Sequence, residues 1–167
     1  MRLLGFRFLS LLAAISAASL MLAALYFQHV QGLEPCPLCV AQRVFVIIIG
    51  LIGLLAFLHN PGAEWIRRIY LGATLLTLAG GIATAGRHVW LQSLPPDRVP
   101  ECGPGLQYIL DNFPFSDALG LIFKGSGECA KVTWTFLGLS MPGWLLLIFA
   151  IMFVIGLARL VAGARAD

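Results

Sequence analysis

The segment LEPCPLCVAQR, residues 33–43, holds two cysteines separated by two residues, and an arginine follows the second cysteine by four positions. A disulfide between Cys36 and Cys39 closes almost no loop, so it constrains the unfolded chain very little. Pro37 suits the first turn of a helix with Cys36 near its cap, and helix N-termini favour the thiolate form that reacts. The segment therefore predicts a redox-active cysteine pair at the start of a helix.

Two further cysteines, Cys102 and Cys129, lie far downstream and leave other interpretations open. Four thiolates can bind zinc, but the spacing of this second pair is not that of a zinc ribbon. Covalent haem attachment requires a histidine directly after the second cysteine of the first pair, and Val40 stands there. Two structural disulfides remain an alternative. We expect no metal site, and we favour thiol–disulfide exchange between the two pairs.

Arg43 is a cation close to the reactive pair, about one turn into an apolar segment. A guanidinium at that depth must extend to the membrane surface or find a partner. Because Arg43 lies four residues after Cys39, the two share a helix face. Its charge can stabilise a thiolate at Cys39, or its N–H groups can bind an oxygen of an electron acceptor. An arginine that only anchors the helix at the membrane surface is the simpler alternative.

His88 lies at the outer end of a later apolar segment, at about the depth expected for Arg43. Spacing of four residues places it on one stripe of a helix, together with small residues that suit close helix packing. The stripe consists of Gly72, Leu76, Gly80, Thr84 and His88. We therefore expect His88 to point into the bundle, as a proton handler or a quinone ligand. An interfacial histidine satisfied by water is the alternative.

The composition indicates that membrane helices position these residues. Of the 167 residues, 59% are hydrophobic and 11% are charged, and the mean hydropathy is +0.90. A soluble domain carries about 25% charged residues. Four segments approach the length of about 20 apolar residues that a membrane-spanning helix needs, and we expect the first to be a retained helix rather than a cleaved signal. The predicted spans are 8–27, 42–58, 69–86 and 143–162.

Arginines mark one side of this predicted bundle. They precede the first span, lie in the link 59–68 and stand at the end of the fourth span. The positive-inside rule makes this side cytoplasmic, together with both termini. The loops 28–41 and 88–142 then hold all four cysteines in the oxidising periplasm of a bacterium. The net charge of +3 includes no basic run, so the sequence gives no support to nucleic-acid binding.

The long predicted periplasmic loop begins with a segment rich in proline and glycine, residues 94–105, that presents Cys102. Such a composition predicts an extended, exposed chain. Residues 106–125 then form two short pieces with apolar faces, and Ser116 can cap the second. Neither piece is long enough to span a membrane. We expect short amphipathic helices at the membrane surface, and an ordinary packed loop is the alternative.

Three segments resemble a known family: CPLC followed by Arg43, HVWLQ from His88, and above all SGECAKVTWTFLGLSMPGWLLLIF from Ser126. Together they make the chain similar to the disulfide bond formation protein B (DsbB) family over nearly its whole length. The resemblance implies a single-domain, four-helix protein of the bacterial inner membrane. It also implies re-oxidation of the periplasmic thioredoxin-fold oxidant DsbA and reduction of a quinone, either ubiquinone or menaquinone.

The resemblance also implies roles for individual residues. Cys36 and Cys39 are the expected quinone-coupled pair, and Cys102 and Cys129 are the expected pair that accepts electrons from DsbA. Arg43 matches the quinone-site arginine of the family. His88 matches a family histidine near the quinone.

Two rival functions can be distinguished from this one, the first by the position of its cysteines and the second by its thiol chemistry. Vitamin K epoxide reductases share four helices and cysteine pairs, but their redox Cys-x-x-Cys lies late in the chain, whereas here it precedes the second span. A membrane scaffold with structural disulfides is the other rival. Its disulfides should resist mild reductant and should not respond to added quinone.

Overall fold

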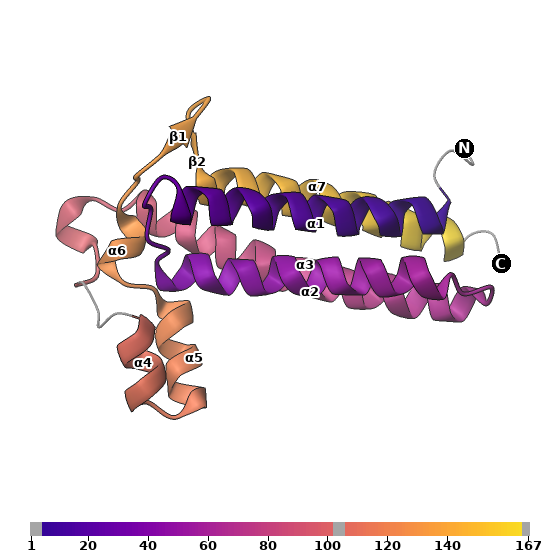
Figure 1. Ribbon diagram of the computed structural model, residues 1–167, viewed down its shortest axis with the longest axis horizontal. Coiled ribbons are helices and arrows are strands. Elements are labelled where there is room, and N and C mark those ends of the chain that lie inside the picture. Colours follow the sequence, from indigo (N-terminus) through magenta and orange to yellow (C-terminus); the bar gives the residue numbers. More distant parts are fainter. Residues whose placement is uncertain (1–4, 102–105, 165–167) are drawn as a thin grey trace.

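The computed structural model describes residues 5–101 and 106–164 as a bundle of four long antiparallel helices with smaller elements at one end (Figure 1). Each long helix is apolar enough to cross a membrane. The predicted all-α, four-helix membrane architecture is therefore confirmed. The helices are α1 (Phe6–His29), α2 (Pro37–His59), α3 (Glu64–Gln92) and α7 (Met141–Ala164).

All four helices extend beyond the predicted spans. Hydropathy marks only the part of a helix that suits the membrane interior, and a helix can continue through the polar interface. The largest differences are at α2, which begins at Pro37 instead of residue 42, and at α3, which continues to Gln92 past the polar residues Arg87 and His88. As a result, α2 includes the end of the predicted loop 28–41, and the first cysteine pair lies at its start, as Pro37 indicated.

The helices pack side by side through small residues. α1 packs on α2, α2 on α3, and α3 on α7. A methyl group at Gly53 would lie 2.8 Å from the backbone oxygen of Ser10, and one at Gly81 would lie 2.7 Å from the Phe149 ring. Glycine at both positions therefore permits close helix approach. The buried core consists of Ala17, Val46, Ile49, Leu78 and Phe149.

The two ends of the bundle differ in their residues. The start of α1, the end of α7 and the turn between α2 and α3 lie together at one end (Figure 1). The described arginines of this end are Arg7, Arg67, Arg68 and Arg159. The start of α2, the end of α3 and the smaller elements lie at the other end, which holds the described cysteines.

The segment after α3 forms the smaller elements. They are the 3₁₀ helix η1 (Pro96–Arg98), the helices α4 (Leu106–Asn112), α5 (Phe115–Lys124) and α6 (Gly127–Ala130), and the strands β1 (Thr135–Phe136) and β2 (Leu139–Ser140). Short helices in this loop were expected, and α5 is strongly amphipathic. The expected cap was wrong, because Pro114 precedes the first turn of α5 and Ser116 lies inside the helix.

The hairpin of β1 and β2 was not predicted. Its strands pair in antiparallel fashion through a turn in which Leu137 and Gly138 both have positive φ. Positive φ at both central residues matches the twist of the flanking strands, although leucine is an unusual residue there. The Trp144 indole N–H donates to the Phe136 carbonyl at 3.0 Å. This bond fixes the hairpin to the first turn of α7.

Candidate functional site

The first cysteine pair begins α2, as predicted. Cys36 is the N-cap in an extended conformation, and Pro37 is the first helical residue. One turn of helix brings the two sulfurs together, with 3.3 Å between Cys36 Sγ and Cys39 Sγ. Both are free thiols; Cys36 is buried and Cys39 is half-buried. This geometry suits a pair that forms and breaks a disulfide without moving its backbone far.

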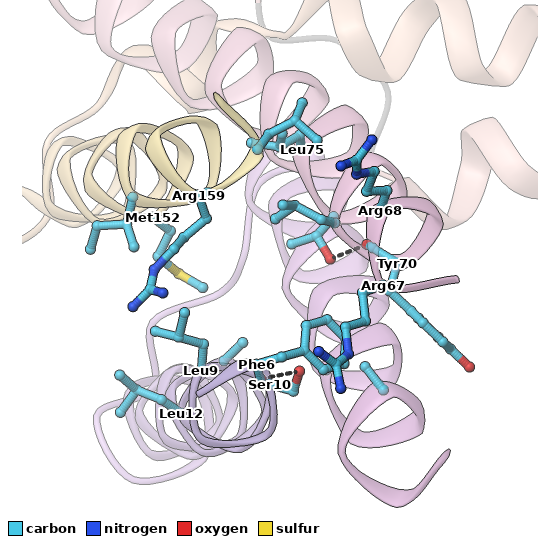
Figure 2. A pocket seen from close by; sticks show the side chains of 18 of the residues that line it. Phe6, Leu9, Ser10, Leu12, Arg67, Arg68, Tyr70, Leu75, Met152 and Arg159 are labelled. Carbon is cyan, nitrogen blue, oxygen red and sulfur yellow. Dashed lines mark hydrogen bonds between the residues drawn. The ribbon is translucent and has the colours of Figure 1, made fainter. Parts of the chain in front are cut away.

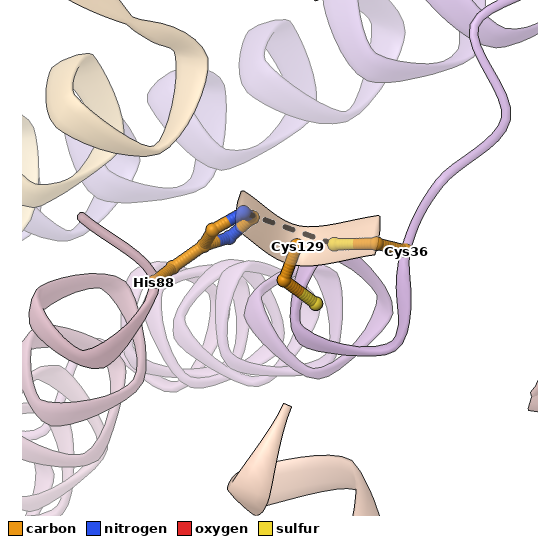
Figure 3. A group of neighbouring side chains, drawn as sticks. All are labelled: Cys36, His88 and Cys129. Atoms are coloured by element: carbon orange, nitrogen blue, oxygen red, sulfur yellow. Dashed lines mark hydrogen bonds between the residues drawn. The ribbon is translucent and has the colours of Figure 1, made fainter. Parts of the chain in front are cut away.

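Cys129 from α6 lies beside this pair. It is a fully buried, free thiol, although it is far from Cys36 in sequence. Cys36 Sγ, Cys129 Sγ and a ring nitrogen of His88 all lie within 4.8 Å of one another (Figure 3). Cys102, its expected disulfide partner, lies outside the described residues, so that pairing stays a prediction. The structure thus joins the two predicted cysteine pairs through Cys36 and Cys129.

A tight turn after α5 seats Cys129 on the ends of α2 and α3. Gly125 has a φ of +77°, and a methyl group there would lie 2.6 Å from Leu91 and 3.0 Å from Leu38. Glycine meets both demands because it has no Cβ. Arg87 at the end of α3 donates to the Lys124 carbonyl at 3.2 Å. These contacts hold the returning chain close enough for α6 to cover Cys36.

His88 is buried at the end of α3 and contacts both α2 and the sulfur cluster. Its Nε2 lies 3.8 Å from Cys36 Sγ, and its Nδ1 lies 3.2 Å from the Gln42 amide nitrogen. An amide N–H that donates to Nδ1 leaves the imidazole proton on Nε2, which faces Cys36. Gln42 was missed from the sequence. A buried amide inside an apolar helix was the available signal.

The inward stripe predicted on α3 is only partly correct. Thr84 and His88 are buried as expected, but Leu76 is 77% exposed and Gly72 is also exposed. A spacing of four residues advances about 40° beyond a full helical turn, so such a stripe winds around the helix. Only the part of the stripe near the cysteine end of α3, at Thr84 and His88, faces the bundle interior.

Arg43 is half-buried and reaches across to α1. Its Nη1 donates to the Gln28 side-chain oxygen, and its Nη2 donates to the Ala24 carbonyl at 3.3 Å. These bonds hold the guanidinium at the edge of a cavity of about 280 Å³, which Cys39 also lines. The shared face of Cys39 and Arg43 is therefore directed at one cavity.

The cavity lies between α1, the start of α2, the segment just before the hairpin and the start of α7. Most of its walls are apolar, and its polar lining comes mainly from Gln42, Arg43 and Glu34. His88 is not among the lining residues. The apolar and aromatic walls are formed by Leu20, Met21, Ala23, Ala24, Phe27, Leu33, Val46, Trp134, Met141, Trp144, Leu145 and Ile148.

The two sulfurs that meet across the helices have opposite acidities. The Cys36 thiol donates to Cys129, and this hydrogen bond lowers the pKa of Cys129 to about 6, with help from backbone hydrogen bonds of Leu38 and Ser126. The same contact with Cys129, the contact with Cys39 and burial raise the pKa of Cys36. Cys129 is therefore the thiolate of this pair near neutral pH. A thiolate directed at a neighbouring sulfur is poised for thiol–disulfide exchange.

Comparison with known proteins agrees with this arrangement. The family model described as "Disulfide bond formation protein DsbB" matches residues 6–159. A disulfide bond formation protein B of Methylococcus capsulatus is 53% identical over 139 residues, which cover 83% of this chain and 84% of that protein. A disulfide bond formation protein B of Nitrosococcus oceani is 52% identical over 154 residues, which cover 92% of this chain and 86% of that protein.

A third relative extends the match to almost the entire chain. The disulfide bond formation protein B of Stutzerimonas stutzeri is 46% identical over 160 residues, which cover 96% of this chain and 98% of that protein. The residues matched by the family model include α1, α2, α3 and most of α7. This chain is a multi-pass membrane protein that belongs to the DsbB family of disulfide bond formation proteins.

Proposed function

We propose that this protein is a protein-dithiol:quinone oxidoreductase that re-oxidises the periplasmic thioredoxin-fold oxidant DsbA. The observation that carries the proposal is a row of three sulfurs. Cys129 comes from the loop, Cys36 lies in the middle, and Cys39 lines the apolar cavity beside Arg43. The row leads from a loop that a soluble partner can reach to a cavity within the helices.

The exchange steps follow from this order of sulfurs. A partner thiolate attacks Cys102 of a Cys102–Cys129 disulfide, and Cys129 leaves as a thiolate. Cys129 then attacks Cys36 of the Cys36–Cys39 disulfide, so the Cys36–Cys129 bond forms and Cys39 leaves as a thiolate. When Cys102, freed by closure of the partner's own disulfide, attacks Cys129, Cys36 is released. The partner has lost two electrons, and Cys36 and Cys39 hold them as thiols.

The cavity beside Cys39 fits a membrane quinone such as ubiquinone or menaquinone. Its apolar and aromatic walls suit a flat ring, and the Arg43 guanidinium offers N–H donors to a ring oxygen. A bound quinone supplies a two-electron, two-proton acceptor. Arg43 would hold it, and its charge also favours the thiolate form of Cys39 on the same helix face.

His88 and Gln42 would serve the proton side of this chemistry. His88 presents its Nε2 to Cys36, and Gln42 joins His88 to the cavity, because it contacts His88 Nδ1 and also lines the cavity wall. This geometry favours His88 as a proton handler at Cys36 over His88 as a direct quinone ligand. The histidine would donate its Nε2–H to the Cys36 sulfur when that sulfur is released as a thiolate.

The arginine end of the bundle supports an orientation in the bacterial inner membrane with both termini in the cytoplasm. The cysteine end then faces the periplasm. A membrane-impermeant thiol reagent should label Cys102 in intact, reduced spheroplasts. Labelling of Cys102 only after lysis would reverse this orientation.

Stopped-flow absorbance of the purified protein, mixed with reduced partner and quinone, tests the function. One quinone should be consumed for each partner disulfide formed, and added EDTA should change neither rate, because thiol exchange needs no metal. A scaffold would leave the quinone unreduced. An enzyme of the vitamin K epoxide reductase type would also pass electrons from thiols to a quinone, and it is distinguished instead by a redox Cys-x-x-Cys that lies late in the chain.

A further inference from the structure

A second cavity, larger than the one beside Cys39, lies at the arginine end of the bundle, far from the cysteines. Its volume is about 660 Å³, and residues of all four long helices line it (Figure 2). Its inner walls are apolar. They include Leu9, Leu12, Ala13, Leu71, Leu75, Leu78, Met152 and Ile155. A cavity with such walls suits a hydrocarbon chain better than a polar solute.

The cavity lies where the bundle is least closed. α1 packs mainly on α2 and α7 mainly on α3, and α1 and α7 have little backbone contact with each other. Leu12 of α1 and Ile155 of α7 line the cavity and are each 46% exposed. In a membrane, such exposed apolar side chains face lipid. An acyl chain can therefore enter from the bilayer between α1 and α7.

The cavity mouth is positively charged. Arg67, Arg68 and Arg159 line it, and the acidic side chain Glu64 lines it with them. Three arginines and one glutamate leave two net positive charges where an apolar cavity meets the membrane surface. Basic pockets between membrane helices suit the head groups of anionic phospholipids.

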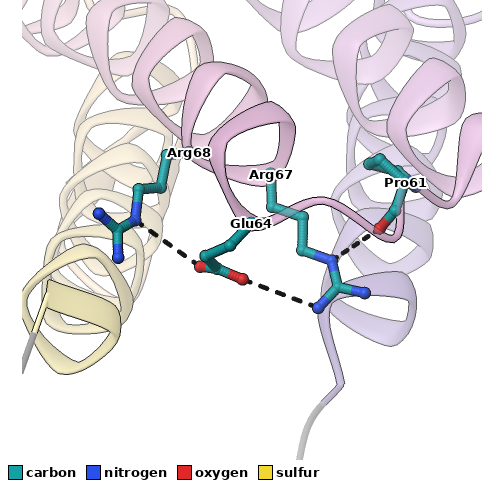
Figure 4. A network of polar contacts seen from close by, with 4 residues as sticks. All are labelled: Pro61, Glu64, Arg67 and Arg68. Carbon is teal, nitrogen blue, oxygen red and sulfur yellow. Dashed lines mark hydrogen bonds and ion pairs between the residues drawn. The ribbon is translucent and has the colours of Figure 1, made fainter. Parts of the chain in front are cut away.

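Local contacts hold two of these arginines in place. Arg67 Nε donates to the Pro61 carbonyl at 2.8 Å, and its Nη1 lies 3.8 Å from Glu64 (Figure 4). Arg68 Nε lies 3.8 Å from the other oxygen of Glu64. Arg67 also stacks over the Phe6 ring at 5.7 Å. The contacts of Arg67 use two of its five N–H donors, so an oriented guanidinium keeps donors for an anion.

Arg159 differs from this pair. It extends from α7 toward α1 (Figure 2), and it has no hydrogen bond or ion pair to any residue in the ranges 5–101 and 106–164. An arginine within an apolar helix is costly unless it pairs with an anion or reaches water. A phosphate between α1 and α7 would pair it, and arginine is well suited to phosphate.

We propose that this cavity binds an anionic phospholipid, with its phosphate on Arg159 and Arg67 and an acyl chain against the leucines of α1 and α3. The proposed orientation assigns the lipid to the cytoplasmic leaflet. The site itself does not depend on the redox function, because its residues and those of the sulfur cluster lie at opposite ends of the bundle.

Native mass spectrometry of the detergent-purified full chain tests the proposal, with phosphatidylglycerol and phosphatidylcholine of identical acyl chains as probes. Phosphatidylglycerol should be retained preferentially. Arg159→Gln should weaken its retention by about fivefold, the effect of removing about 1 kcal/mol per arginine near a lipid surface. Arg159→Lys should keep most of the preference, since it keeps the charge.

Arg7→Gln is the matched control. Arg7 lies at the same end of the bundle but stacks over Phe57 at 4.8 Å and does not line the cavity. Its removal lowers the surface charge equally and should leave retention unchanged. Equal retention of the two lipids, or equal losses in Arg7→Gln and Arg159→Gln, would overturn the proposal. Displacement of the lipid by a long-chain quinone would also overturn the proposal. The same holds if a dimer of the chain formed in place of the lipid-bound form.

Discussion

The two ends of this bundle both carry a cavity, but they differ in where their polar groups lie. At the cysteine end, Cys36, Cys129 and His88 are buried and contact one another. At the arginine end, the cavity is more than twice as large, yet Arg67 and Arg68 are 37% and 38% exposed and interact through one glutamate. Cavity size alone would therefore place the chemistry at the wrong end.

The difference arises from how each end is connected. The arginine end is joined by the short turn between α2 and α3, which covers little of the bundle. The cysteine end is covered by a long segment that folds back through Gly125 and inserts Cys129 among the helix ends. Reactive side chains gather where a loop excludes water.

The largest effect should come from the central sulfur. Cys36→Ser should abolish quinone reduction by the reduced partner, because the Cys36 sulfur is the one that both Cys39 and Cys129 contact. Steady-state quinone absorbance checks this. Arg159→Gln, at the other end, should leave the rate essentially unchanged. Substantial turnover in Cys36→Ser would remove the row of sulfurs from the mechanism.

Arg43→Ala should have the next largest effect. Loss of a charged hydrogen-bond donor at the cavity edge should raise the KM for quinone by about 10- to 100-fold. Single-turnover exchange with the partner should change little, since Arg43 does not contact Cys36 or Cys129. Arg43→Lys should restore only part of the quinone affinity, because a point charge lacks the planar fork of donors. Unchanged KM and kcat would return Arg43 to a purely anchoring role.

The acidity of Cys129 gives a prediction about pH. Its lowered pKa, about 6, means that the thiolate is populated above pH 6 and is lost as the pH falls through that value. The thiolate population should fall about tenfold between pH 7 and pH 5. Ultraviolet absorbance of the thiolate in the reduced protein follows this titration.

The cause of that acidity can be checked separately. Cys36→Ala removes the thiol that donates to Cys129, so the midpoint should move up toward the usual value for a cysteine. An unmoved midpoint would mean that the backbone hydrogen bonds of Leu38 and Ser126 are sufficient to stabilise the thiolate.

The smallest effect is expected at Gln42. Gln42→Leu removes the hydrogen bond to His88 Nδ1 and should slow turnover by about two- to tenfold. A purely structural role would not change the tautomer of His88, so nitrogen NMR shifts of that imidazole are the decisive measurement. Gln42→Glu, whose carboxylate can only accept from Nδ1–H, should shift the imidazole proton to Nδ1 and give the opposite tautomer. A mixture of tautomers in the unsubstituted protein would exclude a positioning role for Gln42.

The sequence predicted those features that depend on local pattern. Four apolar segments give four helices because each satisfies its backbone hydrogen bonds internally. Pro37 after Cys36 gives the helix start, because proline needs no N–H partner there. The arginine groups and the cysteines separate to opposite ends because short links make neighbouring helices antiparallel.

Contacts between distant segments could not be predicted in this way. Cys129 meets Cys36 only because Gly125 turns the chain at positive φ against Leu38 and Leu91, and nothing near Cys129 in the sequence specifies that contact. The partnership of Gln42 with His88 depends on the rotation of α2 against α3. The hairpin was hidden because its turn uses leucine where asparagine or glycine is usual.

The position of Cys36 between two sulfurs has a consequence that follows from valence. A divalent sulfur bound to its own Cβ has one remaining bond, so Cys36 can be joined to Cys39 or to Cys129 but never to both. The Cys36–Cys129 disulfide toward the loop and the Cys36–Cys39 disulfide beside the cavity therefore cannot exist at the same moment. The molecule must therefore form these two disulfides in turn. Electrons from the loop reach the cavity only by one exchange at Cys36 at a time.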